Sequence, residues 1–191
     1  MVKEPRPGRV KTRLGRGIGR IAATWWFRHQ SARLIRRLRD SRWRIVLAVA
    51  PDLAVSSRVW PHDIARHPQG QGDLGQRMAR MLRRAGAAPG RVNQGPVCLI
   101  GADIPGVTRA HIARAFAALG CHDAVFGPAC DGGYWLVGCK HPRTLPHGLF
   151  RNVRWSSEHA LADTLRSLPG FRIALTDTLR DVDTAADLPA R

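Results

Sequence analysis

The sequence predicts an α/β protein in which a largely parallel sheet carries helices on both sides. From Ile45 onward, short apolar runs alternate with amphipathic stretches, which is the pattern of strands and helices in such folds. The length of 191 residues fits one domain of ordinary size. Hydrophobic residues make up 44% and charged residues 24%, as in globular proteins. We therefore expect a single folded domain spanning residues 1–191.

The predicted strands are short runs of apolar residues, as expected for strands buried on both faces. Two of them, around Phe126 and Tyr134, are close enough in the chain to form a hairpin, which would place one antiparallel strand in the sheet. The runs are Ile45–Val49, Val97–Ile100, Ala124–Phe126, Tyr134–Val137 and Phe171–Leu175.

The predicted helices are amphipathic stretches that each follow a residue suited to capping. An earlier helix is indicated by apolar residues at helical spacing from Phe27 to Leu38, with arginines flanking them. The three later helices, with their caps, are Asp73–Ala85 with Asp73, Thr108–Leu119 with Thr108, and Ser157–Leu168 with Ser156.

Apolar patterning and cysteine spacing exclude two classes of protein. No apolar stretch approaches the ~18 residues of a membrane span, and the arginine-rich N-terminus lacks the apolar middle of a secretory signal. The four cysteines form no C-x-x-C pair, so reduced and mostly packed thiols are expected. We expect a cytoplasmic protein with no membrane span.

The formal net charge of +17 is concentrated at the start of the chain. Residues 1–44 carry a net charge of +12, and the remaining residues carry +5. Such a segment can attract nucleic acid, anionic lipid or a phosphorylated small molecule. Because 28 of the 31 cations are arginine, the composition of a GC-rich genome explains the excess equally well.

Two glycine-containing loops are candidates for ligand binding, since ligands of open α/β sheets bind beyond the carboxyl ends of the strands. The loop Lys3–Leu14 has two prolines, Gly8 and several cations before a helix, which indicates either a phosphate cradle or a basic surface turn. The loop Gln69–Met78 has three glycines that would let backbone approach a flat ligand. It is also explained by a turn before a helix capped by Asp73 and Gln76.

Two further loops carry carboxylates. Asp103 follows a predicted buried strand and is placed to meet Mg²⁺ or Mn²⁺ on a diphosphate, or else it is a turn residue. Asp131 precedes two glycines and the aromatic pair Tyr134 and Trp135. It would accept a proton or a hydroxyl hydrogen bond beside a pocket shaped by those rings, or simply belong to an Asp-Gly hairpin turn.

Taken in order, these loops resemble one family. The motifs are K-x-P-x-P-G-x-V-K-T-R-L, Q-G-x-G-D-L-G-x-R-M, G-A-D-I-P, G-P-x-x-D-G-G-Y-W-L-V-G, a W-S segment and D-V-D-T-x-x-D-L, and they span Lys3 to Leu188. The set resembles bacterial GT-A-type glycosyltransferases of the arsenosugar-biosynthesis type, which are related to molybdenum-cofactor and phospholactate guanylyltransferases. The resemblance implies a three-layer αβα, Rossmann-like nucleotide-diphosphosugar transferase fold.

The resemblance also implies roles for individual residues. Lys11 and Arg13 would contact phosphates, and the loop with Gly72, Asp73 and Gly75 would line the nucleotide base. Asp103 would bind the metal as a reduced D-x-D motif. Asp183 would supply a second metal contact, although a helix N-cap before Ala185 explains it equally well.

The chain departs from the family pattern at two places. Members usually have an apolar strand just before the K-x-P-x-P-G loop, centrally in the sheet, whereas only Met1 and Val2 precede Lys3 here. A missing or truncated central strand would expose neighbouring backbone, so either the true start lies upstream or the product folds poorly. Cys130 stands where relatives often have a carboxylate, which weakens a paired-acid site beside Asp131.

We therefore expect a metal-dependent glycosyltransferase that takes a nucleotide sugar and a small-molecule acceptor, with Mg²⁺ or Mn²⁺ as cofactor. Charge stabilisation by Lys11, Arg13 and the ion on Asp103 would assist departure of the diphosphate, while Asp131 would act on the acceptor hydroxyl. The first alternative is a guanylyltransferase-like nucleotidyltransferase that uses a nucleoside triphosphate. The others are a basic nucleic-acid-binding module, with nucleic acid the less favoured partner, and an inactive truncated remnant.

Overall fold

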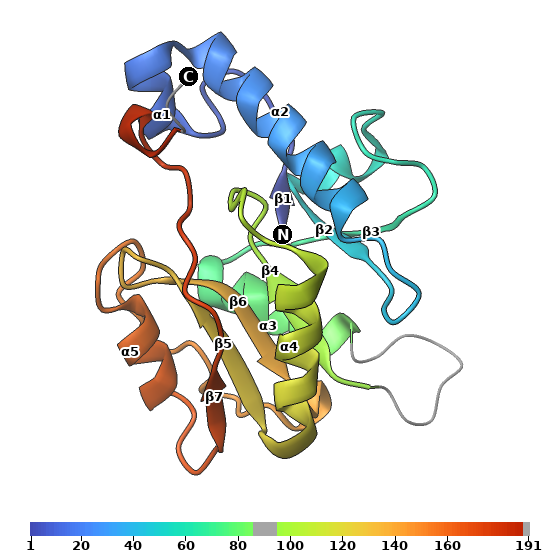
Figure 1. The fold of residues 1–191 in the computed structure, drawn as a ribbon, viewed down its shortest axis with the longest axis vertical. Coiled ribbons are helices and arrows are strands. Elements are labelled where there is room, and N and C mark those ends of the chain that lie inside the picture. The colour runs from blue at the N-terminus through green and yellow to red at the C-terminus, as the bar shows by residue number, and fades with distance from the viewer. Residues whose placement is uncertain (86–94, 189–191) are drawn as a thin grey trace. The chain divides into compact units, whose positions relative to one another are not determined.

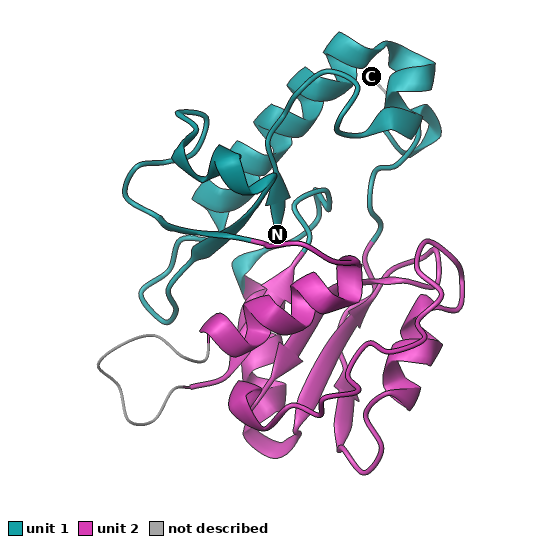
Figure 2. Ribbon diagram, turned by 180° about the vertical axis from the view of Figure 1, so that it is seen from behind, with its two compact units in different colours: residues 1–68, 101–109, 180–191 teal, residues 69–100, 110–179 magenta. Residues whose placement is uncertain are grey.

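A computed structural model of the protein describes residues 1–85 and 95–188 (Figure 1). Its contacts divide the chain into two compact units, coloured separately in Figure 2. Unit 1 consists of residues 1–68, 101–109 and 180–191, and unit 2 consists of residues 69–100 and 110–179. Two compact units can belong to one domain, so the single domain expected from the sequence stays a prediction.

Unit 1 contains a three-stranded parallel sheet in the order β1-β2-β3. The strands are β1 (Val2–Lys3), β2 (Val46–Ala50) and β3 (Ala65–Pro68). The first strand, expected to be missing or truncated, is present as two residues, with Val2 opposite Val49 and Lys3 opposite Ala50. In this sheet β2 takes the central place.

The helices of unit 1 are α1 (Thr12–Ile18) and α2 (Arg20–Arg37), with short 3₁₀ helices η1 (Asp52–Ser56) and η3 (Ala185–Asp187). As the helical spacing predicts, α2 buries Phe27, Ser31, Leu34 and Ile35 on one side. A small core of Leu14, Ala23 and Val182 joins the two helices to the last part of the chain.

Unit 2 contains a mixed four-stranded sheet in the order β4-β6-β5-β7. The predicted hairpin is confirmed, because β5 (Ala124–Pro128) and β6 (Tyr134–Cys139) pair antiparallel. β4 (Val97–Ile100) is also antiparallel to β6, and β7 (Ile173–Leu175) is parallel to β5. The expectation of a mostly parallel sheet therefore holds for unit 1 and not for unit 2, where β6 runs opposite to both of its neighbours.

Helices cover both faces of the sheet in unit 2. In Figure 1 α4 (Arg109–Cys121) lies in front of the strands, and in Figure 2, seen from behind, α3 (Leu74–Ala85) lies in front of them. A 3₁₀ helix η2 (Pro142–Thr144) and α5 (Ala160–Arg166) complete the unit. The predicted start of α5 near Ser157 is three residues too early: Ser156, the predicted cap, adopts a left-handed backbone with φ of 59°, and the N-cap of α5 is His159.

The core of unit 2 consists of apolar side chains from the predicted strands and helices. Each large side chain that is fully buried stabilises the fold by about 1.5–3 kcal/mol. Large side chains that are at most 2% exposed include Phe126, Leu136, Val125, Val137, Leu82 and Leu119.

The four cysteines are free thiols, as expected, but only part of them is packed. Cys139 is buried and Cys98 is half-buried, whereas Cys121 and Cys130 are exposed. Burial raises the pKa of Cys139 to about 12, and burial together with the neighbouring Cys139 raises the pKa of Cys98 to about 12. These two thiols stay protonated at neutral pH and are poor nucleophiles.

Helix length and hydropathy can also be compared with the needs of a bilayer. Among the residues that the structure describes, no helix is both long and apolar enough to cross a membrane.

Candidate functional site

The loop between β1 and α1 turns sharply just before Lys11. Gly8 has a φ of 73°, a value that glycine adopts without strain, and the Arg9 amide donates to the Arg6 carbonyl at 3.0 Å. Lys11, the N-cap of α1, is also left-handed, with φ of 45°. This conformation costs a residue with a β-carbon about 1–2 kcal/mol, so other contacts of Lys11 must offset it.

Those contacts are with two carboxylates from distant parts of the chain. The Lys11 Nζ atom lies 2.7 Å from Asp103 Oδ2 and 3.2 Å from Asp183 Oδ1. Arg13 Nη1 donates to Asp183 Oδ2 at 2.7 Å. The four residues, named here the Lys11 cluster, all belong to unit 1. The sequence analysis expected this cationic turn and Asp103 to grip one ligand, and the structure brings them into direct contact.

Backbone geometry places both carboxylates. Asp103 follows β4 in the chain, and a β-carbon at Gly101 would lie 2.9 Å from its Oδ1 atom, so the glycine leaves room for the carboxylate. The Asp103 carbonyl accepts the Val182 amide at 3.3 Å, which links this turn to the segment that carries Asp183.

Asp183 does not cap the short helix that follows it. Thr184 is the N-cap of η3 and forms a capping box with Asp187. Asp187 also accepts the Asp183 amide at 3.2 Å. The Asp183 carboxylate is therefore left for Lys11 and Arg13. Asp187 is a supporting residue that the sequence analysis missed, although the T-x-x-D spacing signals such a box.

The charges of the Lys11 cluster are set by burial and by one another. Burial would lower the pKa of Lys11, but Asp103 and Asp183 raise it above its ordinary value, so the amine is protonated at neutral pH. Burial would raise the pKa of Asp183, but Arg13 and Lys11 lower it, so the carboxylate is ionised.

The lysine faces inward and the carboxylates face outward. The Lys11 side chain is 6% exposed, whereas those of Asp103 and Asp183 are 34% and 37% exposed. Arg13, at 61%, is the exposed cation. A ligand that approaches the cluster therefore meets two carboxylates and one guanidinium before it meets the ammonium group.

Two outward carboxylates are a donor set for a divalent ion of a particular kind. Among the described residues, no group of three or more His, Cys, Asp or Glu side chains could hold a metal by itself. Mg²⁺ commonly binds one or two protein carboxylates and completes its coordination with water and substrate phosphates. The residues present fit such an ion.

The glycine loop before α3 is built as the capping alternative predicts. The Gln76 amide donates to Asp73 Oδ1 at 2.8 Å, and the Asp73 amide donates to Gln76 Oε1 at 3.1 Å. Gly72 has a φ of 110°, which favours glycine. A β-carbon at Gly75 would lie 2.6 Å from that of Phe150, so this glycine is required for packing within unit 2. Contact of Gly72, Asp73 and Gly75 with a nucleotide stays a prediction.

Asp131 lies in the exposed turn of the β5–β6 hairpin. Its Oδ1 atom accepts the Gly133 amide at 2.9 Å, and the Ala129 amide donates to the Gly133 carbonyl at 2.9 Å. Gly132, with φ of 83°, packs so closely on Glu158 that a β-carbon would lie 2.2 Å from its carbonyl oxygen. The turn accounts for Asp131 structurally, and its catalytic role stays a prediction.

The two aromatic residues after this turn are held inside unit 2. Trp135 is 3% exposed, and its Nε1 atom donates to the Asp177 carbonyl at 2.9 Å. Burial raises the pKa of Tyr134 above its ordinary value, and its ring packs edge-on against Phe126. Both rings serve packing, and a role in an acceptor pocket stays a prediction.

The sequence analysis missed a second ionic cluster, which surrounds Asp163 on α5. Arg154 donates to this carboxylate from Nε at 2.8 Å, from Nη2 at 2.9 Å and from its backbone amide at 3.0 Å. Arg166, one helical turn away, pairs with the same carboxylate. The D-x-x-R spacing signals the second pair, but nothing in the sequence ties residue 154 to residue 163.

Comparison with known proteins identifies the family of the chain and a similar solved structure. The model of DUF2064, described as an uncharacterized protein conserved in bacteria, matches residues 34–157. No protein with a curated description matches the chain. The chain is similar to the crystal structure of a proposed nucleotide-diphospho-sugar transferase from Desulfovibrio desulfuricans G20, with 28% identity and a TM-score of 0.77. The match covers 96% of this chain and 80% of that one.

Proposed function

Since the chain belongs to DUF2064, a family of bacterial proteins without an assigned activity in its description, we propose a function from its own geometry. The proposed activity is transfer of a sugar from a nucleotide diphosphate sugar to a small-molecule acceptor. The Lys11 cluster would bind the diphosphate. The likeness to the Desulfovibrio protein supports the class of donor, because that protein is described as a proposed nucleotide-diphospho-sugar transferase.

The observation that carries the proposal is the convergence of Lys11, Asp103 and Asp183 within hydrogen-bonding distance. In the chain, Asp103 lies 92 positions and Asp183 lies 172 positions after Lys11, so only the fold brings the three residues together. A purely structural ion pair needs one partner for the lysine, whereas here a second carboxylate and the exposed Arg13 extend the cluster toward solvent.

The outward carboxylates determine how a diphosphate would bind. The Lys11 ammonium neutralises only part of the charge of Asp103 and Asp183, so these carboxylates would repel an anion unless a second cation bound on their outward side. There they would hold Mg²⁺ or Mn²⁺. When bound, the ion supplies positive charge opposite the diphosphate.

The chain's own cations would do the remaining electrostatic work. Lys11 fixes the positions of both carboxylates and stays protonated. Arg13 is exposed and presents a guanidinium that can donate two hydrogen bonds to a phosphate as negative charge grows on the leaving group. Asp131 remains the predicted base, which would take the proton from the hydroxyl group to which the sugar is transferred.

Thermal unfolding with a panel of nucleotide diphosphate sugars, each with and without Mn²⁺, tests the proposal. A ligand present at 100 times its Kd adds about 2.7 kcal/mol to stability. For a chain of this length, that corresponds to a rise in the melting midpoint of about 5–10 °C. We expect the rise with metal present and its loss with a chelator or in Asp103→Asn.

The matched control is Asp63→Asn, because Asp63 is an exposed carboxylate of unit 1 that pairs with Arg39 at 2.6 Å. This variant should keep the metal-dependent rise. Stabilisation that is unchanged by chelator or by Asp103→Asn would contradict the proposed metal site. Pyrophosphate release from nucleoside triphosphates without sugar transfer would establish the nucleotidyltransferase alternative instead.

A further inference from the structure

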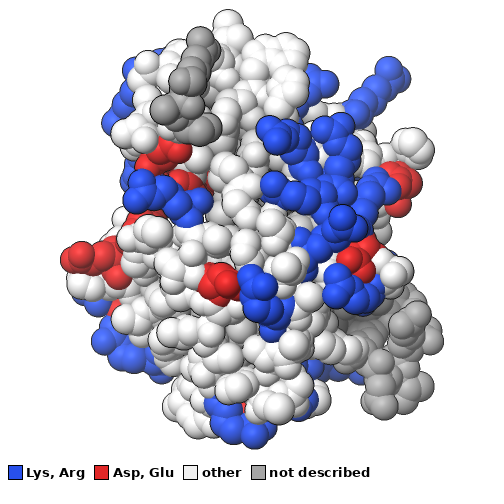
Figure 3. Space-filling view, viewed as in Figure 1, with Lys and Arg blue, Asp and Glu red and all other residues white. Residues whose placement is uncertain are grey.

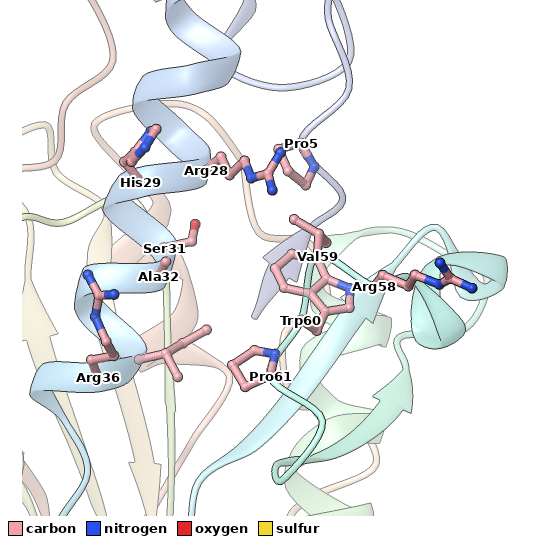
Figure 4. Close-up of a pocket in the computed structure, with 11 residues that line it drawn as sticks. Pro5, Arg28, His29, Ser31, Ala32, Arg36, Arg58, Val59, Trp60 and Pro61 are labelled. Carbon is pink, nitrogen blue, oxygen red and sulfur yellow. The ribbon is translucent and has the colours of Figure 1, made fainter.

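A pocket of about 420 Å³ lies within unit 1, apart from the Lys11 cluster in the residues that form it. It is lined on one side by α2 and on the other by the connection between β2 and β3, with Pro5 at its edge (Figure 4). The volume is within the range of small-molecule sites in proteins. The lining residues that matter below are Arg28, Ser31, Ile35, Arg36, Arg58 and Trp60.

One wall of this pocket is apolar and firmly held. Trp60 is 5% exposed, and its Nε1 atom donates to the Ala54 carbonyl at 3.0 Å, which fixes the ring. The guanidinium of Arg66 on β3 donates to the carbonyls of Val55, Ser57, Trp60 and Pro61 at 3.0–3.2 Å. Ile35, 6% exposed, lines the opposite side. A flat or apolar group can therefore enter without much reorganisation of the protein.

A buried polar group on α2 has no partner inside the protein. Ser31 is 2% exposed, and its Oγ atom makes no hydrogen bond. In Figure 4 Ser31 lies on the side of α2 that faces Val59 and Trp60. A buried hydroxyl without a partner is unfavourable, and a polar atom of a ligand in the pocket would satisfy it.

Positive charge without a carboxylate partner lies around the pocket, and one of its arginines, Arg28, also lies over the Trp25 ring at 5.4 Å. Within residues 1–85 and 95–188, no carboxylate pairs with Arg28, Arg36 or Arg58, and no acidic residue lines the pocket. Figure 4 shows Arg28 reaching from α2 toward Pro5, with the exposed Arg36 and Arg58 on opposite sides. Figure 3 shows the Lys and Arg side chains crowded over the carboxyl-terminal half of α2.

We propose that this pocket binds a small organic phosphate that carries a flat or apolar group. The phosphate would accept hydrogen bonds from Arg28 and the Ser31 hydroxyl, and the organic part would pack between Trp60 and Ile35. A doubly charged phosphate is favoured over a carboxylate, because its greater negative charge is attracted more strongly by the arginines around the pocket, and its extra oxygens can accept from both Arg28 and Ser31. The site is independent of the proposed transfer reaction.

Isothermal titration with phenyl phosphate in the presence of EDTA tests this inference. We expect phenyl phosphate to bind at least tenfold more tightly than inorganic phosphate, which lacks the apolar part, and than benzoate, which has one less charge. Arg28→Gln should weaken phenyl phosphate binding at least tenfold. The matched control Arg33→Gln removes an arginine from the same helix that does not line the pocket, and should change binding less than twofold.

Ser31→Ala separates a binding role from a structural one. The variant should weaken phenyl phosphate binding about three- to tenfold, because the ligand loses a donor. Its melting midpoint without ligand should stay unchanged or rise, because a buried hydroxyl without a partner is removed. Asp103→Asn should keep phenyl phosphate binding, which distinguishes this pocket from the Lys11 cluster.

Three results would overturn the inference. One is equal binding of phenyl phosphate and inorganic phosphate. Another is a lower melting midpoint for Ser31→Ala, which would mean that the hydroxyl has a partner within the protein. The third is tighter binding of a short single-stranded oligonucleotide that Arg28→Gln and Arg33→Gln weaken equally, which would assign the arginines to a nucleic-acid surface.

Discussion

The Lys11 cluster in unit 1 and the Asp163 cluster in unit 2 are built from the same chemical groups in opposite order. In unit 2 the carboxylate is inside, with the Asp163 side chain 3% exposed, and its partners Arg154 and Arg166 are 57% and 69% exposed. In unit 1 the cation is inside and two carboxylates face solvent.

This difference shows that the ability of an ionic cluster to bind a ligand depends on which of its charged groups are exposed to solvent. The Asp163 carboxylate has its hydrogen bonds satisfied by arginines and a backbone amide, so the cluster ties α5 to the segment before it. The Lys11 cluster leaves carboxylate oxygens accessible to a further cation. We therefore expect substitutions in the Asp163 cluster to change stability alone, and those in the Lys11 cluster to change both stability and ligand binding.

The largest effect is expected for Lys11→Met. Removing the buried ammonium leaves two carboxylates without their shared partner, and because each is about one third exposed, the expected loss is about 2 kcal/mol, below that of a fully buried pair. Metal-dependent binding of nucleotide sugars should be lost as well. Urea unfolding and thermal shift measure the two effects.

The control for Lys11→Met is Arg13→Gln, which removes a mostly exposed cation from the same cluster. Its unfolding free energy should change by less than about 0.5 kcal/mol. Equal destabilisation by the two substitutions would show that burial of the lysine does not distinguish it from the arginine.

A smaller effect, on stability only, is expected for Asp163→Asn. The amide keeps one acceptor oxygen, and the exposed Arg154 and Arg166 remain solvated, so the melting midpoint should fall less than in Lys11→Met. Donor binding in the presence of Mn²⁺ should be unchanged. A loss of donor binding in this variant would remove the contrast between the two clusters.

The pH dependence of stability should reflect both clusters. Hydrogen bonds from Arg154 hold the pKa of Asp163 well below its usual range, and Arg13 and Lys11 lower the pKa of Asp183 against the effect of burial. A lowered carboxyl pKa contributes stability above about pH 4, and this contribution disappears as the pH falls through the folded-state value. The raised pKa of Lys11 contributes stability below about pH 10.5, which disappears at higher pH.

Unfolding free energies measured across pH on three proteins test these signs. Compared with the wild type, Asp163→Asn should show a shallower decrease on the acid side, and Lys11→Met a shallower decrease on the alkaline side. A steeper decrease in either variant would mean that the corresponding pKa shift has the opposite sign.

Outside the two ionic clusters, a small effect is expected at Asp73, whose carboxylate accepts a backbone amide at the start of α3. Asp73→Ala should cost about 1 kcal/mol because the cap is lost, whereas Asp73→Asn should cost little because asparagine caps helices equally well. Urea unfolding of both variants measures how much a carboxylate adds to the free energy of unfolding when it acts only by accepting a hydrogen bond. Equal destabilisation would show that its charge matters as well.

Much of the fold could be predicted, because apolar runs mark buried strands. The strands β2, β4 and β6 correspond to the predicted runs Ile45–Val49, Val97–Ile100 and Tyr134–Val137. β3 was missed, because its residues Ala65–Pro68 are Ala-Arg-His-Pro, which show neither an apolar run nor alternation. Its pairing with β2 is a tertiary effect that a local pattern does not contain.

The candidate site could be predicted in part for a similar reason. Lys11 and Asp103 stand in loops whose composition is unusual, so their meeting could be expected from the rule that ligands bind beyond strand ends. The inward lysine and outward carboxylates could not, because burial depends on how Val182 and Gly101 place the two acidic turns.

The separation between Lys11 and Asp183 also has a consequence for synthesis on the ribosome. The two residues are 172 positions apart, and the stretch of sequence between them contains every residue of unit 2. A nascent chain therefore carries its lysine with one eventual partner still untranslated, while the strands of unit 2 emerge. Joining the two ends is a late event, and slow assembly of this centre is expected even when unit 2 folds quickly.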